Sequence, residues 1–447
     1  MKLFNRISTT VLVLLIAATL AQSINANPKS NWPQWRGPEG QGVSTETGLP
    51  VEWSKSKNVK WKTPIAGRGH SSPIVWGKKI FLTTALDGEA IPGRKPGVTH
   101  KLLDGTDFVH PDAVGADLKH TFKVISLDRD SGKILWERVA YEGPVHDSRH
   151  KKASFASSTP ATDGKYVFAF FGSEGLYAYD YSGKLIWKQD LGKLGTASVG
   201  YGVSPILHGK LVIMQCDESS GNSFMVAFDK KTGKEAWRTP RKVDVTWSTP
   251  VLVHTGNRTE IIAAAAEAII AYDPLTGKEL WRHKGLESNA VPTPVVLNDL
   301  VVVTSGYPAK IALALRAGGK GDVTGTPQLV WTYNKGTAYV PSPIAYGEYV
   351  YLMTGNGSIT CLDAKTGKMT YEGARVPKAT MFMSSPVAFE GKILLTSEEG
   401  DTFVLKAGPR HEVLRTNSLG EPVYASPAIA DGNIFIRGEQ NLYAIGK

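Results

Sequence analysis

Short apolar stretches recur along the chain, and each one that opens a repeat follows a Ser-Pro or Thr-Pro pair. The prolines of these pairs are Pro73, Pro160, Pro205, Pro250, Pro294, Pro343, Pro386 and Pro427. The intervals between them are 87, 45, 45, 44, 49, 43 and 41 residues. A unit that recurs at this period is typical of the four-stranded blade of a β-propeller. The pattern predicts an all-β fold, an eight-bladed propeller of four-stranded antiparallel blades over residues 58–447.

Each repeat has the same internal order of apolar and polar positions. A glycine turn follows the first stretch, and the third apolar stretch ends in Asp before a Thr-Gly-Lys or Ser-Gly-Lys turn. Glycine supplies the positive φ that such turns need. The fourth stretch then carries an aromatic residue, which is Trp136, Trp187, Trp237, Trp281, Trp331 or Tyr371. Their spacing indicates that these rings pack across the seam between neighbouring blades, because indole rings present a large apolar face.

The last repeat, residues 424–447, has room for only three strands. The missing fourth strand is predicted around Trp61, paired with the stretch Leu442-Tyr443-Ala444. A ring closed in this way leaves no open sheet edge. Residues 27–57 are expected to run extended along this last blade.

The first interval is about 40 residues longer than the others, by comparison with the period expected for one blade. The excess predicts an insertion at about 84–120, between the second and third strands of blade one. Histidines gather around it, and six of the ten in the chain are His70, His100, His110, His120, His146 and His150. Loops carried by a rigid scaffold are where binding residues concentrate.

The N-terminus has the pattern of a secretory signal peptide over residues 1–26. Lys2 and Arg6 precede the apolar run 11–20, and small residues offer cleavage after Ser23 or Ala26. No cysteine follows the run, so no lipid anchor is expected, and no other segment is long and apolar enough to span a membrane. These features predict a periplasmic or secreted protein.

Composition adds three constraints. The formal net charge of +10, or +8 without Lys2 and Arg6, fits either a solvated basic surface or attraction to anionic ligands. No known nucleic-acid motif accompanies it, so a nucleic-acid partner is not expected. Cys216 and Cys361 fall in the third and sixth repeats, which a ring holds too far apart for a disulfide. Separately, we expect the protein to be a monomer.

The segments LDRDSGKILW, FDKKTGKEAW, YDPLTGKELW and LDAKTGKMT resemble the repeat of PQQ-like, quinoprotein dehydrogenase-type eight-bladed propellers. The opening WPQWRGPEGQGVS resembles secreted bacterial members of this group. The resemblance covers about residues 58–447 and implies the fold. It leaves the function open, because quinone-dependent dehydrogenases share the repeat with non-enzymatic relatives such as the outer-membrane β-barrel assembly lipoprotein.

The dehydrogenases of this family hold their quinone over calcium, under a vicinal cysteine pair and on a tryptophan floor. Cys216 and Cys361 are isolated here, and although Trp247 suits the floor, no acidic calcium set can be matched residue by residue. We therefore expect a binding or scaffolding protein whose partner is a protein, a glycan or a small anionic ligand. PQQ with calcium in a dehydrogenase, or another cell-envelope enzyme, is the alternative, and no residue is assigned a catalytic role.

The resemblance places the ligand at the channel mouth, on the face where each inner strand begins. Aromatic or imidazole rings recur three to five residues before the prolines, at His70, Phe155, Tyr201, Trp247, Tyr339, Phe382 and Tyr424. They fit either ligand stacking or packing of the channel top. The Ser or Thr before each proline fits either a hydroxyl ring in the channel or local backbone hydrogen bonds. The predicted ligand-binding residues are His70, His146, Arg149, His150, Tyr201, Trp247, Tyr339 and Tyr424.

The segment 144–152 is the densest group of polar side chains. His146, Asp147 and His150 have the chemistry to bind a divalent metal together with a distant histidine such as His70 or His110. Arg149 and the following lysines have instead the chemistry to hold a carboxylate or phosphate. A solvated loop is the third interpretation, and the sequence leaves all three open.

Overall fold

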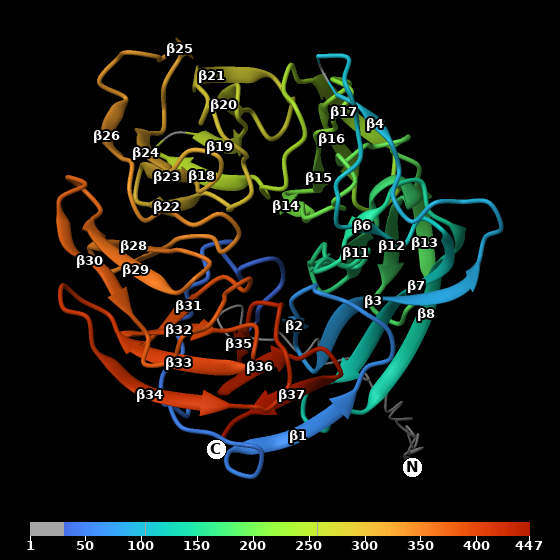
Figure 1. Ribbon diagram of the computed structural model, residues 1–447, viewed down its shortest axis with the longest axis horizontal. Coiled ribbons are helices and arrows are strands. Elements are labelled where there is room, and N and C mark those ends of the chain that lie inside the picture. Colours follow the sequence, from blue (N-terminus) through green and yellow to red (C-terminus); the bar gives the residue numbers. More distant parts are fainter. Residues whose placement is uncertain (1–30, 103, 257) are drawn as a thin grey trace, which may run out of the picture.

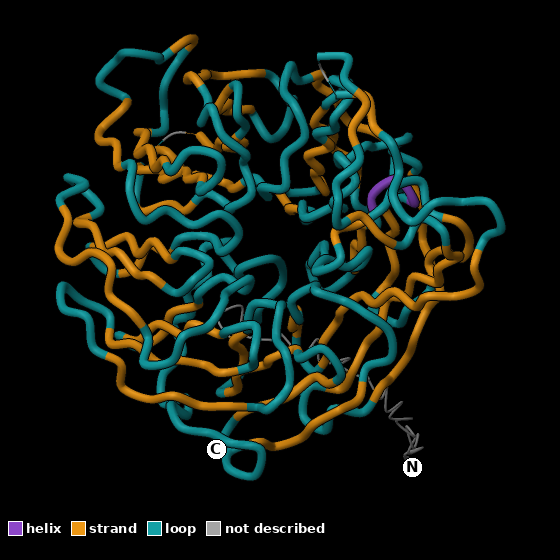
Figure 2. The backbone as a smooth tube through the Cα atoms, in the orientation of Figure 1, coloured by secondary structure: helices purple, strands orange, loops and turns teal. Residues whose placement is uncertain are grey.

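The structure is a computed structural model, and it describes residues 31–102, 104–256 and 258–447. The predicted signal peptide lies outside the described residues. The described chain forms eight antiparallel sheets arranged around a central axis, as Figure 1 shows in a view along that axis. Strands and loops make up nearly all of the molecule, with a 3-10 turn, η2, at Gly172–Glu174 (Figure 2). The predicted all-β, eight-bladed propeller is therefore confirmed.

The first four blades follow the order of the chain, from the inner to the outer strand. They are β2 (Ile74–Trp76), β3 (Lys79–Ala90), β7 (Leu118–Asp128) and β8 (Ile134–Pro144); β10 (Ala161–Thr162), β11 (Tyr166–Phe170), β12 (Leu176–Asp180) and β13 (Leu185–Gln189); β14 (Ile206–His208), β15 (Leu211–Cys216), β16 (Phe224–Asp229) and β17 (Glu235–Pro240); and β18 (Val251–Thr255), β19 (Arg258–Ala264), β20 (Ala268–Tyr272) and β21 (Glu279–Lys284). Blade four gains a fifth, parallel strand, β25 (Gly321–Asp322), on its outer edge.

The remaining blades repeat this order. They are β22 (Val295–Leu297), β23 (Leu300–Ser305), β24 (Ile311–Arg316) and β26 (Leu329–Tyr333); β27 (Ile344–Tyr346), β28 (Tyr349–Met353), β29 (Ser358–Asp363) and β30 (Met369–Arg375); β31 (Val387–Phe389), β32 (Lys392–Thr396), β33 (Asp401–Lys406) and β34 (Val413–Ser418); and β35 (Ala428–Ala430), β36 (Asn433–Arg437), β37 (Asn441–Ile445) and β1 (Val59–Pro64). The last strand, β1, comes from the start of the described chain. It pairs antiparallel with β37, and Trp61 lies opposite Ala444 as predicted.

Tryptophans of the outer strands pack on the turn of the following blade. The ring of Trp187 lies over Gly233, and its indole N–H donates to the Lys230 carbonyl at 3.0 Å. Trp61, Trp237 and Trp331 repeat this contact on the turns at Arg129, Pro274 and Ala364. Trp281 differs, because its N–H donates to the buried Glu260 carboxylate within its own blade.

Residues 31–57 cross the ring instead of following the last blade alone. Asn31 accepts from the amide of Gly77 in the β2–β3 turn, and Glu46 accepts from Gly432 in the β35–β36 turn. Between these contacts, Val43 bridges Ala388 in β31 of blade seven. These turns lie at the far ends of the inner strands, so the segment covers the face opposite the entry loops (the blue chain near the ring centre in Figure 1). The predicted path was therefore wrong, because contacts with several blades bury more apolar surface than one blade offers.

Blade one has a long insertion between its second and third strands. Strands β3 and β7 extend into it as a long hairpin, and residues 91–117 form the loop. This loop contains β4 (His100–Lys101), β5 (Asp107–Phe108) and β6 (Ala113–Val114), and β6 pairs with β9 (Arg149–His150) in the entry loop of blade two. The insertion thus lies on the entry face, where the channel opens.

Candidate functional site

A central cavity of about 450 Å³ lies on the entry face, inside the ring of blades. Its ring-bearing lining residues are Trp35, His70, His110, His150, Tyr201, Trp247, Tyr339 and Tyr424, and Lys152 lies beside them. Among the described residues, none that line this cavity is an Asp or a Glu. The wall is therefore aromatic and hydrogen-bonding, with its fixed charge positive.

The aromatic wall is held in place by backbone contacts and stacking. The Trp247 indole N–H donates to the Gly200 carbonyl at 2.8 Å, which fixes the plane of its ring. The imidazole of His70 stacks on Tyr424, with ring centroids 4.6 Å apart. Tyr201 shares a hydrogen bond of 2.9 Å with the Ser173 hydroxyl. Burial raises the pKa of the Tyr201 hydroxyl well above its usual value, so this ring stays neutral.

Three arginine side chains contribute positive charge near His70. Burial, followed by the positive charges of Arg68, Arg437 and Arg149, holds the pKa of His70 well below its usual value, so the imidazole is neutral at neutral pH. The Arg437 guanidinium is 2% exposed and donates to neutral oxygens of Ser71 and Thr83. Burial lowers the pKa of Arg437 to about 9. This side of the cavity therefore carries positive charge without a carboxylate in direct contact with Arg437.

The Ser and Thr hydroxyls before the prolines form a hydrogen-bonded ring. In seven of the eight steps, the backbone N–H of one such residue donates to the hydroxyl oxygen of the equivalent residue in the next blade, at 2.8–3.1 Å. Seven of these residues line the cavity, namely Thr159, Ser204, Thr249, Thr293, Ser342, Ser385 and Ser426. Both interpretations of this motif hold, since the hydroxyls satisfy backbone groups and also surround the channel. Ser72 belongs to the ring but does not line the cavity.

Six of the eight predicted ligand-binding residues meet at this cavity, and two do not. His70, His150, Tyr201, Trp247, Tyr339 and Tyr424 line it. Arg149 is 7% exposed and lies over the Phe155 ring, where its guanidinium donates to the Ala153 carbonyl. His146 lies in a separate pocket with Glu174 and Tyr141. Arg149 and His146 therefore do not line this cavity.

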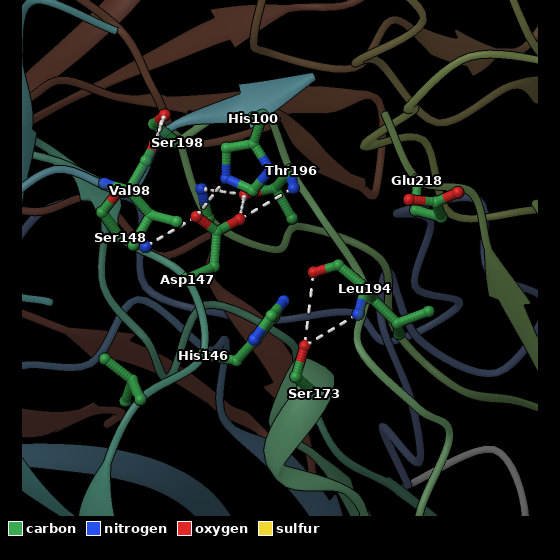
Figure 3. A network of polar contacts seen from close by, with 12 residues as sticks. Val98, His100, His146, Asp147, Ser148, Ser173, Leu194, Thr196, Ser198 and Glu218 are labelled. Atoms are coloured by element: carbon green, nitrogen blue, oxygen red, sulfur yellow. Dashed lines mark hydrogen bonds and ion pairs between the residues drawn. The ribbon is translucent and has the colours of Figure 1, made fainter. Parts of the chain in front are cut away.

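The predicted metal set of His146, Asp147 and His150 is also separated. Asp147 is buried, and its Oδ1 lies 2.7 Å from Nε2 of His100, while its Oδ2 accepts from the amide and hydroxyl of Thr196 (Figure 3). This carboxylate ties the insertion, through His100, to the entry loops of blades two and three. In Figure 3, His146 lies outside this network, beside Ser173. The role of Asp147 is thus explained by anchoring the insertion.

A different trio has the spacing of a metal site. Ligand atoms of His110, Asp112 and His150 lie within 4.8 Å of one another at the cavity rim. However, Nδ1 of His110 accepts from the Asp112 amide and Nδ1 of His150 accepts from the Lys152 amide, at 3.1 and 3.0 Å. A neutral imidazole that accepts at Nδ1 carries its proton on Nε2. To bind a metal through Nε2, both rings would have to give up these contacts, so the two imidazoles are better suited to donating hydrogen bonds through Nε2.

Three cavity residues lie outside the predicted ligand-binding set, although the sequence had marked His110 as a possible metal ligand and Lys152 as a possible anion contact. His110 comes from the insertion, and Lys152 comes from the blade-two entry loop, where it forms an ion pair of 2.9 Å with Glu398 of blade seven. Trp35 belongs to the segment that crosses the far face, and it reaches the cavity floor. The histidine density gave a signal for His110. No repeat pattern marks Trp35, because it lies outside the repeats.

The fold and its central cavity define an eight-bladed propeller of the PQQ-like type. Residues 120–372 match the family model described as "Outer membrane protein assembly factor BamB". This match covers more than half of the chain, so the chain belongs to that family. A curated relative with the same description, from Burkholderia pseudomallei (strain K96243), is 31% identical over 113 residues. That alignment spans 25% of this chain and 28% of the relative, well under two thirds of its length.

Solved structures show the same fold. BamB from Moraxella catarrhalis superposes with a TM-score of 0.53 and 12% identity, over 81% of this chain and 100% of that one. Quinohemoprotein alcohol dehydrogenase from Comamonas testosteroni gives a TM-score of 0.60 and 12% identity, over 95% and 82% of the two chains. At this identity the likeness concerns architecture. An assembly factor and an alcohol dehydrogenase are thus both among the fold's neighbours.

Proposed function

We propose that this protein is a binding or scaffolding protein of the cell envelope that holds a flat, aromatic or sugar-like ligand in its central cavity. The observation that carries the proposal is the wall formed by Trp35, Tyr201, Trp247, Tyr339 and Tyr424 around about 450 Å³. Small-molecule sites have this size and this mixture of aromatic side chains with few polar groups. Flat rings gain free energy from stacking on such a wall.

The cell-envelope location is supported by the N-terminal signal-like sequence and by the family description, which names the outer membrane. In the described part of the chain, no helix has the length and apolar character to cross a bilayer. A protein partner is a second candidate, because the family is described as an assembly factor. Tyr307, Tyr339 and Met381 are exposed on entry-face loops and offer apolar contact surface to such a partner.

The enzyme alternative is a PQQ-dependent dehydrogenase with calcium. Calcium takes oxygen ligands, usually including carboxylates. The described lining has hydroxyl and imidazole groups but no Asp or Glu, and the nearby Glu398 is paired with Lys152. Cys216 and Cys361 lie in β15 and β29, in separate blades, and do not form a vicinal pair. The residues present therefore do not fit the calcium-quinone group, and this favours binding over oxidation chemistry.

Trp247→Ala tests the binding proposal. We expect 2-naphthoate and uronic-acid oligosaccharides to bind with a change in tryptophan fluorescence, and the substitution to weaken binding by about tenfold because one stacking face is lost. Isothermal titration calorimetry gives the affinity. Leu275→Ala, which removes an exposed side chain that does not line the cavity, is the control and should leave the affinity unchanged.

The same titration separates the alternatives. Failure of every probe to bind, or equal affinity in Trp247→Ala and the unsubstituted protein, would contradict the proposal. Tight binding of PQQ that depends on Ca²⁺, together with dye-linked oxidation of alcohols, would favour the dehydrogenase instead.

A further inference from the structure

The hydroxyl ring has one interrupted step. Thr293 Oγ1 accepts the indole N–H of Trp35 at 2.8 Å, in place of the backbone N–H of Thr249 that the repeat would supply. No described residue accepts the Thr249 N–H. The Trp35 ring therefore closes the floor at this step, and a backbone donor is left free beside it.

The hydroxyl groups of the ring also lack a hydrogen-bond acceptor among the described residues. Each ring hydroxyl oxygen accepts one N–H, and within the described residues none of these hydroxyls donates to a protein oxygen. The ring residues are between 1% and 4% exposed, and seven of them line the cavity. A buried donor without an acceptor is costly, and such donors are normally paired. The floor of the cavity thus presents several hydrogen-bond donors, the ring hydroxyls and the Thr249 N–H. Each hydroxyl oxygen already accepts one hydrogen bond from an N–H group of the protein.

The charges around the cavity point in the same direction. Lys152 lines it but is paired with Glu398 at 2.9 Å, so the positive charge without a carboxylate partner is that of Arg437, which contacts Ser71 next to the ring and has only neutral oxygens as hydrogen-bond partners. No described lining residue is acidic. A wall with these charges attracts anions and disfavours cations.

We propose that the ring binds an oxyanion group of the cavity ligand, a carboxylate or a phosphate, at the interrupted step between Thr249 and Thr293 over Trp35. This inference rests on the proposed function and adds the orientation and class of the ligand. The ligand's ring stacks on the aromatic wall, and its anionic end accepts from the Thr249 N–H and from neighbouring hydroxyls. Hydrogen bonds to an ionised acceptor are roughly twice as strong as neutral ones, so charge at this end sets the preference.

Three probes of similar shape test the proposal: 2-naphthoate, 2-naphthyl phosphate and 2-naphthalenemethanol. We expect one or both anions to bind about tenfold or more tightly than the neutral alcohol, by calorimetry at fixed ionic strength. The anion that shows the preference identifies the carboxylate or the phosphate as the natural group. Equal binding of all three would overturn this inference and leave the proposed function standing, whereas binding of none would overturn both.

Thr249→Val and Ser72→Ala form a matched pair of variants. Each removes a hydroxyl that accepts one N–H of the ring, but only Thr249 lines the cavity. The preference for the anion should fall about tenfold in Thr249→Val and persist in Ser72→Ala. Thr249→Ser, which keeps the hydroxyl, should restore it. An equal loss in both variants, or no loss in either, would overturn the assignment.

Discussion

At the scale of single residues, the blade-two entry loop shows how neighbours in sequence separate in space. Arg149 and His150 form β9 and pair with β6 of the insertion. Successive side chains of a strand point to opposite sides, so His150 reaches the cavity while Arg149 is buried over Phe155. Two residues earlier, Asp147 turns toward His100. The sequence showed that this loop is polar. Which of its side chains face the cavity depends on the pairing of β9 with β6, a strand of the blade-one insertion.

Glu174 gives a prediction at this scale. Burial raises its pKa from 4.5 to about 7, partly offset by the hydrogen bond that Oε1 accepts from the His146 amide. Between these pH values the folded protein holds a proton that the unfolded chain has lost, so stability falls as the pH rises. Glu174→Gln removes this effect, and its free energy of unfolding relative to the unsubstituted protein should increase by about 3 kcal/mol from pH 4.5 to 7.5.

Urea unfolding at several pH values measures this difference. Glu142→Gln, at an exposed position of β8, is the control and should run parallel to the unsubstituted protein. A pH dependence of Glu174→Gln identical to that of the control would contradict the prediction.

At the scale of elements, the tryptophan-on-turn contact is what repeats around the ring. Gly233 has a φ of +70°, and a Cβ placed there would lie 2.8 Å from the Trp187 ring. Gly391 has the same φ of +70°, with no atom within 4 Å of such a Cβ. The two glycines therefore separate the backbone cost of a substitution from its packing cost.

Gly233→Ala should lower stability more than Gly391→Ala. The second substitution carries only the left-handed backbone penalty of about 1 kcal/mol. The first adds overpacking against Trp187, about 1–3 kcal/mol more. Thermal unfolding followed by circular dichroism ranks the two. Equal midpoints would mean that the ring of Trp187 moves aside freely and does not hold the seam.

The repeat made the blades predictable, because prolines, turn glycines and outer-strand tryptophans recur at one period. Ring closure near Trp61 followed from counting strands, and the ring-bearing residues at Tyr201, Trp247, Tyr339 and Tyr424 followed from their position before the prolines. Trp35 was beyond such reasoning, since a non-repeating segment reaches its place through contacts with several blades. The same holds for the cluster of His110 and His150, which two separate loops bring together.

At the scale of the whole molecule, the first described residues hold the ring together in two ways. Residues 31–57 cover the far face and then the outer strand β34, where the Trp53 amide donates to Asn417; Trp32 and Trp53 are buried, at 1% and 2% exposed. Strand β1 then completes the last blade through its pairing with β37. Covering a face and closing an edge are separate contributions, and shortened chains can separate them.

A chain that begins at Asn58 keeps β1, whereas one that begins at Ile65 lacks it. Both should be less stable than a chain from Asn31, because the buried tryptophans are lost. Only the chain from Ile65 should associate as its concentration rises, since β37 becomes an open edge. Light scattering at several concentrations detects this. A monomeric chain from Ile65 would show that the edge is protected in another way.

Ring closure also ties folding to the order of synthesis. The ribosome delivers β1 before the strands of the ring, and its partner β37 emerges last among the described strands. The Val51 carbonyl likewise accepts a hydrogen bond from Asn417, which lies 366 residues further along the chain. Contacts this distant in sequence form slowly. A polypeptide that stops short of Asn441 has no partner strand for β1, so its last blade cannot be completed. The ring therefore closes only after β37 has been synthesised.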